Sequence, residues 1–316
     1  MDAPFTPLAP EKFRDPLTTA KGDVRASVDF VGLETLWLNT GTLCNIECAH
    51  CFMKSGPRND RLVYLTLEQV TGFLDEIADL GLATRIIGFT GGEPFMNKAF
   101  PSMLDAVLAR GHEALVLTNA MQPLWQRRDA LSNLAARHGT ERLTMRVSID
   151  HYTPEPHEDE RGPGSWTLVQ RGVEWLAGGG FRLSVAGRTR WGEDPAAVRQ
   201  GYRDLFDVWG LDVDAFDPGQ LILFPEMDER IDVPEITTAC WNIVGVRPQD
   251  QMCATQRMVV WRKGRPAPHL VPCTLLPFGR EFDLGPRLAD ALGPVALNHP
   301  HCARFCVLGG ASCTPA

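Results

Sequence analysis

Residues 34–52 read ETLWLNTGTLCNIECAHCF, an apolar run followed at once by three closely spaced cysteines. The run predicts a buried β-strand, so Cys44, Cys48 and Cys51 fall on the loop that follows it. Three soft thiolates at this spacing suit an iron-sulfur cluster or zinc. In a 4Fe-4S cluster, three protein ligands leave one iron open to a further ligand. The alternative is a zinc site completed by His50 or by a distant cysteine.

Beyond this stretch, short apolar runs alternate with amphipathic stretches up to about residue 225, as in parallel βαβ units. Six strands are predicted, at Glu34–Asn39, Arg85–Phe89, Glu113–Thr118, Leu143–Ile149, Arg182–Arg188 and Gln220–Phe224. Helical patterns lie near residues 67–80, 98–110, 129–138, 167–178 and 196–209. Thr66 followed by Gln69 is a capping-box signature for the first helix. Such units close partly into a barrel or open as a doubly wound sheet, and either arrangement places chemistry at the carboxyl ends of the strands.

Further motifs follow the ends of these strands. Thr-Gly-Gly-Glu-Pro at 90–94 comes after the second strand, Leu-Thr-Asn-Ala at 117–120 ends the third, and Val-Ser-Ile-Asp at 147–150 ends the fourth. The loop at 157–166 then reads HEDERGPGSW. In this order, and with the Cys-x3-Cys-x2-Cys spacing, the motifs resemble the radical S-adenosylmethionine (SAM) superfamily. The resemblance covers roughly residues 33–225 and implies a partial (β/α)6 TIM-like barrel.

The resemblance also implies roles for these residues. The first three cysteines would hold a SAM-binding 4Fe-4S cluster, and Gly91, Gly92 and Glu93 would hold the methionyl amino group of SAM. The further candidates for contacts with SAM or substrate are Thr118, Asn119, Ser148, Asp150 and Arg188. The arginine among them is the candidate partner of the SAM carboxylate, because a guanidinium fork matches it bidentately. Taken singly, the glycine pair would only be a turn, the polar residues strand-end groups and the arginine a surface residue.

The composition changes after Pro225, where the regular alternation stops and six of the nine cysteines appear. We therefore predict a domain boundary near 226–239. The predicted organisation is an N-terminal extension at 1–30, a radical SAM core at 31–230 and a small cysteine-rich α+β extension at 231–316.

The later cysteines follow a second pattern. Cys253 and Cys273 flank a predicted hairpin, and Cys302, Cys306 and Cys313 come after it. This resembles the SPASM or twitch extension of radical SAM proteins, which carries auxiliary clusters. Four ligands close a 4Fe-4S cluster, so we assign the first four of these cysteines to one auxiliary cluster, with the fifth able to replace one of them. The structural alternative is a zinc knuckle that staples a small domain.

Cys240 is left over, beside Trp241. It is either a small buried apolar side chain or a donor that returns a hydrogen atom to a substrate radical, as an epimerase would need. His299 and His301 are either surface groups or donors to cluster sulfurs.

The composition also indicates whether the protein binds nucleic acids or membranes. A count of 31 Lys and Arg against 39 Asp and Glu gives a formal charge of -8 without long runs of one sign, which disfavours a nucleic-acid partner. No stretch of about 18 apolar residues and no N-terminal apolar segment occur, so we expect no membrane span. A cytoplasmic protein with reduced cysteines is the resulting expectation.

The resemblance implies that a reduced cluster cleaves SAM to a 5'-deoxyadenosyl radical, which takes a hydrogen atom from a small-molecule or peptide substrate. An external one-electron reductant of the flavodoxin or ferredoxin type would supply the electron. An auxiliary cluster that accepts the electron left on the substrate favours a net oxidation. That would be dehydrogenation or crosslinking of a peptide, or oxidation of a sugar or cyclitol alcohol. The alternatives are a redox-neutral epimerase and a non-catalytic iron-sulfur or zinc protein.

Overall fold

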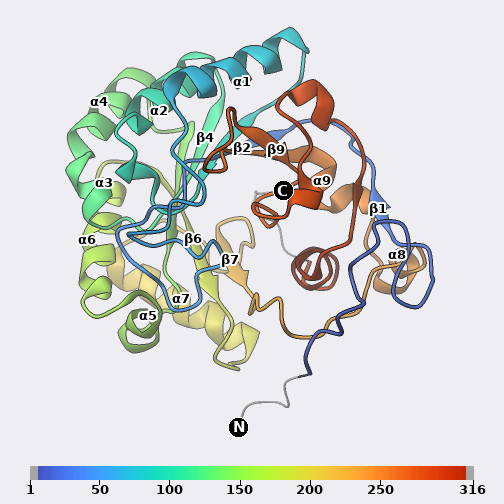
Figure 1. Ribbon diagram of the computed structural model, residues 1–316. Helices are drawn as coiled ribbons and strands as arrows, with labels where there is room; N and C mark the ends of the chain where they lie inside the picture. The colour runs from blue at the N-terminus through green and yellow to red at the C-terminus, as the bar shows by residue number, and fades with distance from the viewer. Residues whose placement is uncertain (1–5, 311–316) are drawn as a thin grey trace.

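The computed structural model describes residues 6–310, within which eight strands form one sheet in the order β7-β6-β5-β4-β3-β2-β8-β9. The strands β2 to β7 are parallel and adjacent in chain order, so they form the predicted partial (β/α)6 barrel (Figure 1). Their bounds are Thr35–Asn39 (β2), Ile86–Thr90 (β3), Glu113–Thr118 (β4), Leu143–Ser148 (β5), Arg182–Arg188 (β6) and Leu221–Phe224 (β7). The α/β fold class is confirmed.

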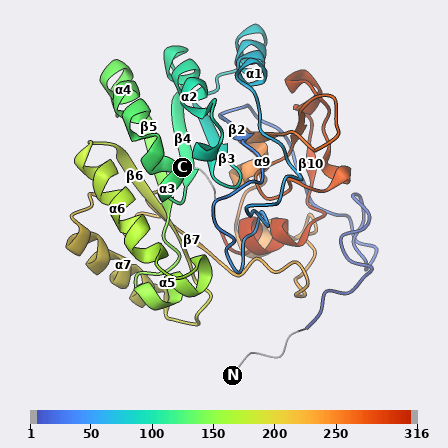
Figure 2. The same ribbon diagram turned by 60° about the vertical axis from the view of Figure 1, so that its left-hand side comes forward.

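The helices that follow these strands cover the outer face of the sheet (Figures 1 and 2). They are Leu67–Asp79 (α1), Phe100–Ala109 (α2), Gln122–Gln126 (α3), Arg128–His138 (α4), Pro154–Arg161 (α5), Ser165–Gly178 (α6) and Pro195–Trp209 (α7), with the 3-10 turn Pro94–Met96 (η1). The capping box at α1 is confirmed, because Thr66 Oγ1 accepts from Gln69 N at 3.3 Å and Gln69 Oε1 accepts from Thr66 N at 2.9 Å. The short helices α3 and α5 were not predicted.

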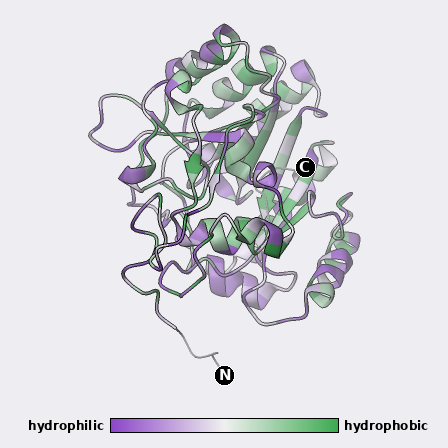
Figure 3. Cartoon of the chain, turned by 90° about the vertical axis from the view of Figure 1, so that its right-hand side faces the viewer, coloured by the Kyte–Doolittle hydropathy of each residue, from purple (hydrophilic) through white to green (hydrophobic). Residues whose placement is uncertain are grey.

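Strand β2 separates two apolar clusters, because successive side chains of a strand point to opposite faces. Leu36 and Leu38 belong to the cluster between sheet and helices, whereas Trp37 belongs to the cluster on the other face. A Cβ added at Gly88 of β3 would lie 2.3 Å from the Trp37 ring, so this strand position needs glycine. Figure 3 shows apolar residues on the inner strands and polar residues on the outer loops.

The C-terminal part builds the second cluster and extends the sheet. Strand β8 (Gln256–Val260) lies parallel to β2, and β9 (His269–Val271) pairs antiparallel with β8, which confirms the predicted hairpin. The pairing of β8 with β2 was not predicted. The other elements here are Cys240–Val244 (α8), Pro248–Asp250 (η2), Met252–Thr255 (α9), Arg280–Phe282 (η3), Leu288–Ala291 (η4), Val295–Ala296 (β10) and the π-helical turn Cys302–Val307 (η5).

The N-terminal segment packs against this C-terminal part. Strand β1 (Ser27–Val28) pairs antiparallel with β10, and Arg25 forms a buried ion pair with Glu235 at 2.5 Å. Among residues 6–310, the helices are all too short or too polar to cross a bilayer.

Candidate active site

The loop between β2 and α1, which carries the first three cysteines, packs on the turn after β3. Gly92 N donates a hydrogen bond to Gly41 O at 2.8 Å. A Cβ added at Gly91 would lie 2.4 Å from Gly41 O, and one added at Gly92 would lie 2.1 Å from Leu43 O. Because no side chain tolerates such approach to backbone, the turn needs glycine at both positions. The glycine pair therefore seats the cysteine loop, while its contact with SAM stays a prediction.

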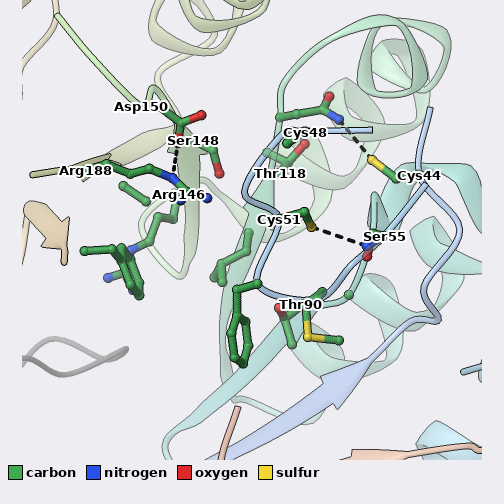
Figure 4. A pocket seen from close by; sticks show the side chains of 18 of the residues that line it. Cys44, Cys48, Cys51, Ser55, Thr90, Thr118, Arg146, Ser148, Asp150 and Arg188 are labelled. Carbon is green, nitrogen blue, oxygen red and sulfur yellow. Dashed lines mark hydrogen bonds and ion pairs between the residues drawn. The ribbon is translucent and has the colours of Figure 1, made fainter. Parts of the chain in front are cut away.

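A cavity of about 200 Å³ opens beside this loop, at the carboxyl ends of the strands. The thiol-bearing residues Cys44, Cys48 and Cys51 line it. Its lining also contains the predicted residues Gly91, Gly92, Thr118, Asn119, Ser148, Asp150 and Arg188. Figure 4 shows Cys44 and Cys51 on one side of the view and Ser148, Asp150 and Arg188 on the other. The structure thus brings together the candidate residues of the barrel, apart from Glu93.

The three thiols have different surroundings. Burial raises the pKa of Cys44 to about 12, and burial also raises the pKa of Cys48. Asn119 Nδ2 lies 3.8 Å from Cys44 Sγ, and Ser55 N donates to Cys51 Sγ at 3.3 Å (Figure 4). In the described part of the chain, no three His, Cys, Asp or Glu side chains already meet as ligands of one ion. The donor set nevertheless fits a thiolate-bound cluster, because three soft ligands share one cavity wall.

Glu93 does not line the cavity. Its side chain is buried and accepts hydrogen bonds from Thr118 Oγ1 at 2.9 Å, Asn119 N at 2.8 Å and Phe95 N at 3.2 Å. Burial raises its pKa to about 7, although these hydrogen bonds act in the opposite direction. Glu93 therefore holds the end of β4 to the turn after β3. The predicted hydrogen bond from the SAM ammonium to Glu93 stays a prediction.

Asp150 is the only carboxylate in the described lining of the cavity, and two arginines hold it. Arg161 Nε donates to its Oδ2 at 2.7 Å, and Arg188 Nε donates to its Oδ1 at 3.2 Å. Burial raises the pKa of Asp150, but the two guanidinium groups outweigh it, so the pKa lies below its usual value. Asp150 is therefore ionised. Arg161 was missed, although it stands in the loop motif at 157–166.

A second group of charged residues, around Glu160, holds the cysteine loop in place. Glu160 is buried at the end of α5, bonds His50 Nδ1 at 3.0 Å and forms an ion pair with Arg190. The Glu160 carbonyl also accepts from Ala49 N at 2.8 Å, and Arg188 Nη2 donates to His50 O at 2.8 Å. The loop is thus tied to α5 and to the end of β6. The sequence pattern held no signal for this network, because its members are distant along the chain.

The remaining wall of the cavity is largely apolar. Its apolar residues come from the cysteine loop, from strand ends and from the C-terminal part, and they are Ile46, Phe52, Met53, Leu117, Ala186, Phe224, Pro225, Met227 and Leu275. Arg146, a buried residue of β5, also lines the cavity and donates to Ser184 Oγ at 3.1 Å. The cavity therefore combines a thiol wall, a guanidinium wall and an apolar wall.

Residues 38–188 match the radical SAM superfamily, and they hold the cysteine loop and all the strand ends just described except that of β7. This segment is a radical SAM domain. Proteins of this superfamily bind a 4Fe-4S cluster and SAM.

Several known proteins resemble this chain. The antilisterial bacteriocin subtilosin biosynthesis protein AlbA of Bacillus subtilis is 27% identical over 264 residues, which are 77% of this chain and 54% of that protein. Mycofactocin maturase MftC of Mycolicibacterium smegmatis is 28% identical over 138 residues, 44% of this chain and 33% of that protein. The chain thus spans about half the length of the first relative and a third of the second.

Two solved structures share the fold. Streptococcus suis SuiB bound to S-adenosylmethionine has a TM-score of 0.57 at 12% identity, over 88% of this chain and 67% of that chain. The structure of anSMEcpe with bound AdoMet has a TM-score of 0.58 at 13% identity, over 81% of this chain and 79% of that chain.

Beyond the radical SAM domain, the structure gathers the later cysteines. Cys253, Cys273, Cys302 and Cys306 line one small cavity of about 10 Å³. Burial raises the pKa of Cys253 to about 11 and that of Cys302 to about 12. These are the four cysteines assigned from the sequence to an auxiliary cluster. Their role as ligands stays a prediction.

The two other cysteines of the later group are placed differently. Cys240 lies on α8, accepts from Thr237 N at 3.4 Å and is not among the described residues that line either thiol cavity. Cys313 lies outside the described residues.

Proposed function

We propose that this chain cleaves SAM reductively and uses the resulting 5'-deoxyadenosyl radical to take a hydrogen atom from a peptide, with net oxidation of the peptide. One observation carries the proposal. The three cysteines of the radical SAM domain share a cavity with the ends of β3 to β7, so a cluster held there would face SAM and substrate in one space. When bound, the cluster supplies the electron that splits SAM.

The chain's own residues would bind and orient these groups. Cys44, Cys48 and Cys51 would ligate the cluster, and the polar groups at the ends of β4 and β5 would contact SAM. Arg161 and Arg188 lie on the same wall, and either guanidinium has donors beyond those that hold Asp150. One of them would bind the SAM carboxylate.

The apolar wall serves a radical reaction. Phe224, Pro225, Met227 and Leu275 line the cavity and offer water no side-chain hydrogen-bonding group. Exclusion of water and of reactive side chains protects a carbon radical from unwanted quenching.

The names of the similar proteins support a peptide substrate. They include a bacteriocin biosynthesis protein and a mycofactocin maturase, and SuiB and anSMEcpe have been solved with a precursor peptide and with the Cp18Cys peptide. A sugar or cyclitol alcohol remains the second substrate class, without an observation of its own in the structure.

The second cavity supports net oxidation. A metal cluster held by Cys253, Cys273, Cys302 and Cys306 would accept the electron left on the substrate after hydrogen removal. A redox-neutral epimerase would instead need a thiol beside the substrate. Cys240 is the predicted donor and lies outside the described cavity linings, which favours oxidation.

The first experiment compares the anaerobically reconstituted chain with its Cys44→Ala/Cys48→Ala/Cys51→Ala variant, both reduced with dithionite and given SAM. We expect 5'-deoxyadenosine from the unchanged chain only, and the variant should keep about four irons, the content of one cubane. Cys240→Ala controls for loss of a thiol as such and should still cleave SAM. A reconstituted chain that holds iron at the first site but leaves SAM intact would refute the proposal.

The reaction outcome needs a substrate. Peptides would be incubated with enzyme and SAM in deuterated solvent and analysed by mass spectrometry. Oxidation predicts a peptide that lacks two hydrogen atoms and carries no solvent deuterium at carbon. Incorporation of one deuterium at carbon without loss of mass would establish the epimerase instead, and Cys240→Ala would then abolish product.

A further inference from the structure

Arg257 of β8 is a fully buried cation beside the second thiol cavity. Its guanidinium donates to the carbonyl oxygens of Ala291 at 2.6 Å, Cys253 at 2.6 Å, Gln256 at 2.6 Å and Gly293 at 2.8 Å. Its Cζ atom also lies 4.6 Å from the centroid of the Phe30 ring, as in a cation–π contact. These carbonyl oxygens accept from four of its five N–H groups, and none of them carries a negative charge.

Two other arginines with little exposed side chain have a carboxylate partner. Arg25 pairs with Glu235 at 2.5 Å, and Arg161 pairs with Asp150 at 2.7 Å. Within residues 6–310, no Asp or Glu side chain forms an ion pair with Arg257. A buried charge without a counter-charge is strongly unfavourable, so a negative group is expected next to it.

The ionisable groups that act on this guanidinium are the thiols of Cys253 and Cys273. Cys253 stands on α9, four residues before Arg257, and its carbonyl oxygen accepts from Arg257 Nη1 at 2.6 Å. Cys273 follows β9, the antiparallel neighbour of β8. Both line the second cavity together with Cys302 and Cys306. Four thiolates carry more negative charge than a zinc ion or a 4Fe-4S core neutralises, so a centre bound there would be net anionic.

We infer that Arg257 is the internal counter-cation of a metal centre held by Cys253, Cys273, Cys302 and Cys306. This role rests on the auxiliary centre proposed above. Arg257 acts through charge and not as a ligand, so it is a positioning residue. Its positive charge stabilises the reduced form of a cluster, which carries one more negative charge than the oxidised form. The midpoint potential of the centre is accordingly higher with Arg257 than without it.

The test uses the full chain with Cys44, Cys48 and Cys51 changed to Ala, so that only the second centre binds metal. Three forms are compared: the parent, Arg257→Met and Arg257→Lys. The Met variant removes the positive charge. The Lys variant keeps the charge but loses the planar set of guanidinium donors. After reconstitution with iron and sulfide, metal content, retention against a chelator and the midpoint potential by EPR-monitored titration are measured.

We expect Arg257→Met to retain metal about 10–100-fold less tightly, the usual cost of losing a group that supports metal ligands. Its midpoint potential should shift to a more negative value. Arg257→Lys should restore the potential, even if its thermal midpoint falls. Phe30→Leu removes the ring near Arg257 without removing charge, so it should leave the potential unchanged and controls for packing.

The outcomes distinguish the existence of the auxiliary centre from the role of Arg257 beside it. A parent protein that binds neither iron nor zinc contradicts the auxiliary centre and with it this role. A metal-loaded Arg257→Met protein with unchanged potential contradicts the role of Arg257 alone. If the parent binds only zinc, retention of zinc against the chelator decides, and equal retention in the Met and Lys forms overturns the inference. If Arg257→Met does not fold, the inference stands only if Arg257→Lys matches the parent in potential or zinc retention.

Discussion

Glu93 shows how one side chain connects the strand ends beneath the cavity. Its oxygens accept from Thr118 Oγ1, Asn119 N and Phe95 N, and removal of the carboxylate would leave these donors buried without an acceptor. We expect Glu93→Ala to lower the free energy of unfolding by about 1–3 kcal/mol, as measured by urea denaturation. Glu93→Gln keeps one acceptor oxygen and should lose less.

The same pair of variants tests the sequence prediction that Glu93 binds SAM. If the carboxylate only joins the end of β4 to the turn after β3, Glu93→Gln should retain most SAM cleavage. A stable Glu93→Gln protein that produces no 5'-deoxyadenosine would instead show direct binding of the SAM ammonium.

His157 provides a pH effect at the same scale. It is fully buried on α5 against Trp166, and no described residue accepts or donates a hydrogen bond at either ring nitrogen. Burial lowers its pKa from 6.5 to about 4, with Arg161 and His151 acting in the same direction and Asp150 opposing them.

The unfolded chain therefore binds a proton at His157 before the folded chain does. The stability that neutral His157 provides is fully present above about pH 6.5 and is lost as the pH falls toward about 4. The loss approaches about 3 kcal/mol at 1.4 kcal/mol per pKa unit. Urea unfolding of the parent and of His157→Phe across this window measures it. A similar slope in both proteins would assign the pH dependence to other groups.

At the scale of elements, the glycine turn after β3 and the cysteine loop form one unit. A Cβ at Gly92 would lie 2.1 Å from Leu43 O, one residue before Cys44. We expect Gly92→Ala to displace the loop and to reduce both iron bound at the first site and SAM cleavage at least tenfold, the effect of a misplaced reacting group. The matched control is Gly72→Ala in α1, where nothing lies within 4 Å of the added Cβ and helix propensity improves. Equal iron content in both variants would mean that the loop tolerates the shift.

The elements also show what local sequence predicts. Strands β4 and β6 have the predicted bounds, because each is an apolar run delimited by polar residues. The prediction that Cys44, Cys48 and Cys51 hold a cluster is equally local, since it rests on their spacing and on the short motifs after the next strands. The ion pairs of Arg161 and Glu160 join residues that only the folded barrel brings together, and Glu160 left no pattern in the sequence.

The placement of β8 is a property of the whole molecule. Its sequence predicted a hairpin with β9, which forms, but its second partner β2 lies about two hundred residues earlier in the chain. Such a pairing depends on the free edge that the barrel leaves beside β2, and no local pattern encodes it. This pairing places the four later cysteines next to the sheet that carries the first three.

The N-terminal segment packs against the C-terminal part, and a buried ion pair between Arg25 and Glu235 joins the two. Arg25 and Glu235 are both nearly inaccessible, and the Glu235 carboxylate also accepts from Phe13 N and Ala20 N at 2.7 Å. Removal of one partner leaves a buried charge, so Arg25→Met should cost about 3–5 kcal/mol of unfolding free energy.

The exposed pair offers the matched control. Lys12 and Asp232 join the same two segments at 2.6 Å but are partly open to water, so Lys12→Met should cost under about 1 kcal/mol. Limited proteolysis should cut the N-terminal segment faster in Arg25→Met than in Lys12→Met. The double variant Arg25→Met/Glu235→Leu removes both charges and should recover part of the loss. If Arg25→Met and Lys12→Met lose equal stability, the segment is held by β1 and its apolar contacts and not by the buried pair.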